Sequence, residues 1–92
     1  MIGVVHCECL IYQAQSLKEK RAVLKSITAR LKQRLNVSVA EMDYHNLWQR
    51  TAISIVTINQ ERQIVEKELQ TALEIIDRMP EMERTVTEYE WL

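Results

Sequence analysis

The chain has 92 residues, of which 47% are apolar and 27% charged, with a net charge of −1. This length and apolar content exclude two separate cores and a disordered chain, so we expect one domain over residues 1–92. No run approaches the roughly 20 apolar residues of a membrane span, and no signal peptide precedes the first alternating segment, which predicts a cytoplasmic protein without a membrane partner.

Residues 2–12 alternate between two sets of side chains, as in a half-buried β-strand. One set is uniformly small or apolar and consists of Gly3, Val5, Cys7, Cys9 and Ile11. Cys7 and Cys9 lie two residues apart and project from the same face, which does not suit a disulfide between them. We therefore expect two reduced, buried thiols rather than a metal or redox pair.

A helix is predicted from about residue 17 to residue 35. Ser16 and Glu19 form a capping box at its start, and Asn36 favours an end there. The apolar residues at helical spacing are Leu17, Leu24, Ile27, Leu31 and Leu35.

Residues 37–43 and 48–58 are rich in β-branched side chains and predict two strands. Residues 44–47 between them predict a short hairpin loop. Asp43 would then face Trp48 across the hairpin, with Glu41 and Arg50 one step further into the sheet. The pattern leaves open which face of either strand is buried.

A second helix is predicted after residue 59, where Asn59 can cap it, and Pro80 ends it. Residues 84–91 predict a last strand. This order of elements predicts an α+β, ferredoxin-like βαββαβ sandwich, with a four-stranded antiparallel sheet and two helices on one face. The other face is then open. We expect Val4, Leu10 and either Tyr89 or Trp91 on it, and such a patch favours a second copy as partner.

The predicted topology brings three segments to one end of the sheet: residues 13–21, 43–50 and 80–83. By helical angle, Lys20 lies on the core side of the first helix, beside Ile27 and Leu31. Two readings stay open. Lys20 either forms a structural ion pair with Asp43 or Glu41, or it contacts a ligand or partner.

The outer side of the first helix carries a basic ridge. Its members, Lys18, Arg21, Lys25 and Lys32, fall within roughly 60° of one another at about 100° per residue. Such a ridge is suited to bind phosphates, although an ordinary solvent-exposed helix face shows the same pattern of charges. Trp48 could stack on a base, or pack in the core or an interface. The candidate partner-binding residues are Lys18, Lys20, Arg21, Lys25, Asp43, Trp48 and Arg50.

The uneven distribution of charge along the chain has two interpretations. It indicates a partner surface on the first half of the chain, or it reflects two solvated helices that differ in charge by chance. Residues 1–50 carry eight Lys and Arg against four acidic residues, whereas residues 51–92 carry four against nine.

Several kinds of site are not predicted. No nucleophile–base–acid constellation is visible, and His6 points away from Cys7 and Cys9, so we expect no catalytic residue, metal or cofactor and no enzyme. An RNA-binding surface on the sheet is also not predicted. Such a surface needs exposed aromatic residues on the central strands, whereas the chain has no Phe and its first strand offers His6 and Glu8.

The segments SLKEKRAVLKSITARLKQRLNVSVAEMD and LWQR resemble the bacterial YlxP-like family, and the resemblance covers nearly the whole chain. It implies a ferredoxin-like fold, no established reaction, and a link to RNA or ribosomal particles through neighbouring genes. The positions it singles out are residues 16–21, Asp43 and residues 47–50. A small RNA- or ribosome-associated accessory protein is therefore one expectation, and a homo-oligomeric interaction or ligand-sensing module is the other.

Overall fold

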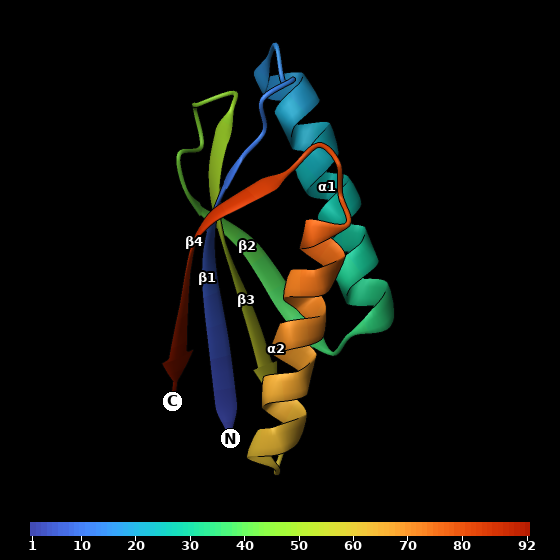
Figure 1. The fold of residues 1–92 in the computed structure, drawn as a ribbon, viewed down its shortest axis with the longest axis vertical. Helices are drawn as coiled ribbons and strands as arrows, with labels where there is room; N and C mark the ends of the chain where they lie inside the picture. The colour runs from blue at the N-terminus through green and yellow to red at the C-terminus, as the bar shows by residue number, and fades with distance from the viewer.

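The computed structural model describes residues 1–92 and confirms the predicted α+β, ferredoxin-like fold (Figure 1). The elements are β1 (Ile2–Leu10), α1 (Leu17–Arg34), β2 (Val37–Asp43), β3 (Arg50–Ile58), α2 (Arg62–Asp77) and β4 (Glu83–Trp91). Neighbouring strands pair antiparallel in the order β2-β3-β1-β4, and both helices lie against one face of the sheet. Neither helix has the length and apolar character needed to cross a bilayer.

The buried face of the sheet is the one predicted for β1. Val5, Cys7 and Cys9 are at most 1% exposed, and both cysteines are free thiols, as expected. The same core cluster includes Ile53 and Ile55 of β3, Ile27 and Leu31 of α1, and Val65, Leu69, Ala72 and Ile76 of α2. Burial of this apolar surface between sheet and helices is the main source of stability.

The helix ends depend on local hydrogen bonds. The Ser16 hydroxyl accepts from the Glu19 amide (3.1 Å), as the capping box predicts, but the Glu19 carboxylate reaches the Gln15 amide instead of Ser16. α2 begins two residues later than expected. Glu61 is its N-cap, and Asn59 accepts from the Glu61 amide (3.0 Å), so Asn59 closes the turn before the helix.

The open sheet face carries Val4 and Leu10, as predicted, since they pair with Val56 and Arg50 of β3. The expectation for β4 was wrong. Tyr89 and Trp91 pair with Val5 and Gly3 and therefore face the helix side. An alternating pattern shows which residues share a face, but the pairing register decides which face that is.

The predicted central hairpin was also wrong in its register. β3 starts at Arg50, so the loop spans residues 44–49, and Asp43 pairs with Ala52 rather than facing Trp48. Two features lengthen the loop. Tyr44 adopts a left-handed backbone (φ 61°), and the pairing shifts between Glu41 and Asp43 in a β-bulge.

Candidate functional site

The start of α1 and the central hairpin are neighbours at one end of the molecule, as the topology predicted (Figure 1). The Ile11 amide donates to the Gln49 carbonyl (2.8 Å), and the Gln49 side chain donates to the carbonyls of Tyr12 (2.9 Å) and Ala14 (3.2 Å). Gln49 therefore ties the hairpin to the loop that leads into α1.

Lys20 makes a second link between the same segments. Its side chain is 1% exposed, and its ammonium lies 2.9 Å from Glu41 Oε2 and donates to the Tyr44 carbonyl (2.6 Å). The buried Thr51 hydroxyl donates to the same Glu41 oxygen (2.6 Å). Of the two readings of Lys20, the structure has the ion pair, with Glu41 rather than Asp43 as the partner. Lys20 positions the hairpin and offers no charge to solvent.

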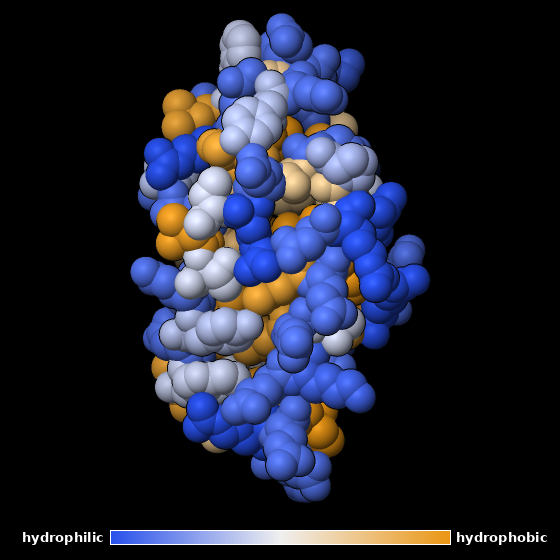
Figure 2. All heavy atoms as spheres, in the orientation of Figure 1, coloured by the Kyte–Doolittle hydropathy of each residue, from blue (hydrophilic) through white to orange (hydrophobic).

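The basic ridge, defined as Lys18, Arg21, Lys25 and Lys32, is exposed along α1. None of its four cations lies within 4.0 Å of a carboxylate, whereas the chain forms five ion pairs elsewhere. Figure 2 shows hydrophilic side chains gathered over the helices on the right of the view. The ridge therefore presents uncompensated positive charge to solvent.

Trp48 is not a core residue. It is 51% exposed and Leu47 is 49% exposed, although large apolar side chains are usually buried. Both line an open cavity of about 490 Å³ on the hairpin, together with Leu10, Asn46, Gln49 and Arg50. This cavity offers a flat aromatic and apolar surface at the same end of the fold as the start of α1.

Arg50 and Asp43 belong to the open sheet face. The Arg50 guanidinium donates to Glu8 (2.6 Å) and lies 4.2 Å from the centroid of the Tyr44 ring. These contacts raise the pKa of Arg50, chiefly through the hydrogen bond to Glu8. The Asp43 carboxylate accepts from the Tyr44 amide (2.7 Å). Arg50 is thus held by Glu8 of β1 and Asp43 by the hairpin backbone, whereas the cations of the ridge have no such partner.

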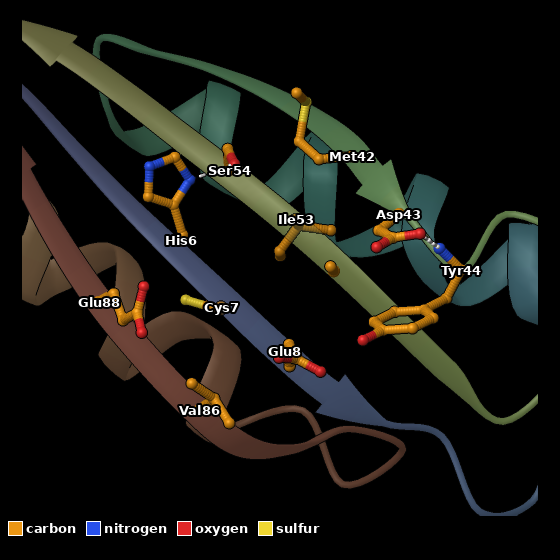
Figure 3. Close-up of a pocket in the computed structure, with 11 residues that line it drawn as sticks. His6, Cys7, Glu8, Met42, Asp43, Tyr44, Ile53, Ser54, Val86 and Glu88 are labelled. Atoms are coloured by element: carbon orange, nitrogen blue, oxygen red, sulfur yellow. Dashed lines mark hydrogen bonds between the residues drawn. The ribbon is translucent and has the colours of Figure 1, made fainter.

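A smaller cavity of about 190 Å³ lies on the open sheet face (Figure 3). Beside it, three strands contribute a line of hydrogen bonds: His6 Nδ1 to Ser54 Oγ (2.7 Å) and His6 Nε2 to Glu90 Oε1 (2.9 Å). This line is not apparent from the sequence. Its members lie 48 and 84 residues from His6 in sequence, so only the strand pairing reveals them.

The Ser54–His6–Glu90 line lacks what acyl transfer needs besides a nucleophile and a base. β3 has a hydrogen-bonded strand on each side, so its backbone amides are occupied by the sheet and supply no oxyanion hole at Ser54. Glu90 and His6 are also exposed to water (52% and 43% of their side chains). The absence of enzymatic activity stays a prediction.

Comparisons with known proteins bear on the family and the fold. The family described as "Protein of unknown function (DUF503)" matches residues 2–89. The chain belongs to this family. It is 53% identical over 91 residues to the uncharacterized protein YlxP of Bacillus subtilis (strain 168), which covers 99% of each chain and confirms the resemblance to the YlxP-like family. A de novo designed protein, Foldit4, has the same fold at 16% identity (TM-score 0.61, covering 100% of this chain and 99% of the other).

Proposed function

We propose that this protein binds single-stranded RNA, free or in ribosomal particles, through the basic ridge of α1 and the hairpin cavity at Trp48. The observation that carries the proposal is the exposed ridge, whose four cations have no carboxylate partner. Cations that neutralise phosphates release counterions, which supplies most of the affinity for nucleic acid. The proposal includes a cytoplasmic location, which suits two free cysteines.

The hairpin supplies the second element of a single-strand site. Base stacking on an aromatic side chain contributes about 1–3 kcal/mol per base and tolerates any sequence. Trp48 is half exposed in a cavity that also contains Arg50. Lys20 belongs to the site as a positioning residue, since its ion pair with Glu41 holds the hairpin beside α1. Asp43 stabilises the start of the hairpin loop locally by accepting from the Tyr44 amide.

Fluorescence anisotropy with a labelled single-stranded RNA tests the proposal. We expect saturable binding at low salt, with a slope of log affinity on log salt near −0.7 for each phosphate contact. Reversal of three ridge charges (Lys18→Glu, Arg21→Glu and Lys25→Glu together) should abolish binding. No detectable binding of the unaltered protein at low salt would refute the proposal.

A matched pair of single variants distinguishes binding at the ridge from a general effect of net charge on RNA affinity. Lys25→Glu lies on the ridge, whereas Lys67→Glu makes the same change of charge on the exposed side of α2. Lys25→Glu should weaken RNA binding several-fold more than Lys67→Glu. Equal losses would show that net charge alone is responsible. Trp48→Ala should weaken binding roughly tenfold without changing the salt slope.

Self-association is a second candidate, supported by apolar side chains on the open sheet face. Met42, Val56, Ile58 and Val86 are each at least 37% exposed, which is unusual for a sheet face that works alone in water. A second copy of this chain would cover them. Sedimentation at high micromolar concentration should then give a dimer or larger assembly, and a strict monomer would remove this candidate.

A further inference from the structure

We propose that the hollow between the C-terminal parts of α1 and α2 binds a phosphate group. It has a volume of about 300 Å³ and five lining residues: Arg30, Gln33 and Arg34 of α1, Ile75 of α2, and Arg78, which caps α2. We call it the arginine notch. Three of its five lining side chains are guanidinium groups, and none is acidic.

The notch is distinct from the basic ridge. At about 100° per residue, Arg30 and Arg34 lie roughly on the opposite side of the α1 axis from Lys18, Arg21 and Lys25. The site therefore needs the packing of α2 against α1, and it does not rest on the proposed RNA site.

The three guanidinium groups have no carboxylate within 4.0 Å, although the chain has 13 acidic residues. The neighbouring acid, Asp77, is already held by Arg84, which donates to both of its oxygens at 2.8 Å. Glu74, one turn before Arg78, forms no ion pair either. The notch therefore holds three positive charges without a compensating side chain.

Like charges four residues apart on a helix, such as Arg30 and Arg34, destabilise it. The negative ends of the helix dipoles offset part of this repulsion, because these arginines lie near the ends of α1 and α2. Stabilisation of the two helix ends does not by itself require that arginines from both helices line the same hollow.

A phosphate group fits the chemistry of the notch. Arginine offers a planar fork of donors that matches two phosphate oxygens at once, and the Gln33 amide can donate to a third. The ligand is either a phosphomonoester on a small molecule or a phosphodiester of an RNA backbone, since both present the same oxygens.

NMR of the arginine Nε–Hε groups during a titration with inorganic phosphate, at constant ionic strength with chloride, tests the site. We expect saturable shifts at Arg30, Arg34 and Arg78 and none at Arg62, which is exposed on α2 and paired with Glu66. Arg78→Gln should weaken phosphate binding roughly tenfold or more, since it removes a charge-assisted fork, whereas Arg62→Gln should not. Shifts that are unsaturable, equal at Arg62 or unchanged by Arg78→Gln would overturn the proposal.

Two further titrations identify the source of the phosphate. An RNA oligomer without terminal phosphates displaces inorganic phosphate only if the notch accepts phosphodiesters, whereas a ribose monophosphate displaces it if the notch takes monoesters. If the ridge variants lose RNA binding but keep the phosphate shifts, the notch does not bind RNA by itself. If the phosphate shifts at the notch are absent while the ridge still binds RNA, the notch proposal is refuted and the RNA proposal is not.

Discussion

Lys20 occupies a position where a lysine is rarely found, because its ammonium is almost fully buried. Three groups make this possible: Glu41 pairs with the ammonium at 2.9 Å, the Tyr44 carbonyl accepts from it, and the Thr51 hydroxyl donates to the Glu41 carboxylate. The network holds the hairpin against the start of α1. The helical angle of Lys20 could be predicted from sequence, but its partner could not, since the choice between Glu41 and Asp43 depends on a β-bulge.

Removing Lys20 alone should be costly. Lys20→Met leaves the Glu41 carboxylate partly buried without its cation, which typically costs about 3–5 kcal/mol. The double variant Lys20→Met with Glu41→Leu should recover most of that loss, since a well-packed apolar pair replaces a buried ion pair at little cost. Urea denaturation measures both. Losses that simply add in the double variant would show that the pair does not act as a unit.

The two thiols should be chemically inert in the folded protein. Burial raises the pKa of Cys7 to about 11 and the pKa of Cys9 to about 12. Since the thiolate is the nucleophile, iodoacetamide should leave both unmodified at mildly alkaline pH and modify both in concentrated guanidinium. Mass spectrometry counts the added groups. Rapid alkylation of the native protein would mean that β1 opens from α2 far more often than its burial implies.

At the scale of the elements, period and capping residues predict the six elements closely, since apolar alternation and helical stripes reflect burial directly. The pairing registers of the strands could not be predicted in this way. A left-handed Tyr44 and the bulge before Asp43 shift the hairpin, and the pairing of β4 turns Tyr89 and Trp91 to the helix side. A tyrosine is not a residue type that signals a left-handed turn, so the hairpin shift leaves no clear local signal. The pairing of β4 depends on β1, a strand at the other end of the chain.

Gly3 lets α2 and β4 approach β1. A Cβ at this position would lie 2.5 Å from Val65 Cγ1 and 2.8 Å from Trp91 Cζ3. Gly3→Ala should therefore cost about 1–3 kcal/mol in thermal or chemical denaturation, since overpacking pushes rigid neighbours apart. Val65→Ala should restore part of that stability when combined with Gly3→Ala. A neutral Gly3→Ala would show that the contact relaxes freely.

The Asp77–Arg84 pair links the end of α2 to the start of β4. The hydrogen bond from Arg84 lowers the pKa of Asp77 below its ordinary value. A lowered pKa in the folded state gives stability that is complete above the unfolded pKa, about 3.9, and is lost as the pH falls through the folded pKa. Because Asp77 is 48% exposed, we expect no more than about 1 kcal/mol.

Comparison of Asp77→Asn with the unaltered protein measures the contribution of the Asp77–Arg84 pair to stability. Denaturation midpoints should differ at neutral pH and converge in strong acid, where both proteins lack the charge. A difference that persists unchanged into strong acid would assign the effect to packing.

At the scale of the whole molecule, positive and negative charge lie on different surfaces. The ridge on α1 is basic, whereas the open sheet face carries Glu8 and Glu88 near His6 (Figure 3), and Glu90 pairs with His6. An acidic sheet face disfavours phosphates, so nucleic acid should avoid the surface that many sheet-based RNA-binding folds use. The ridge could be predicted from helical spacing alone. The arginine notch could not, because Arg78 joins Arg30 and Arg34 only when the helices pack.

The proposed RNA site comprises the ridge of α1 and the hairpin. Mapping of backbone amide shifts by NMR during titration with a single-stranded RNA tests it most directly. We predict perturbed amides in residues 17–25 and 47–50, with little change at Val4, Ser54 and Val56 on the open sheet face. Shifts centred on those three residues, with α1 unaffected, would place the RNA on the open sheet face and refute the proposed site.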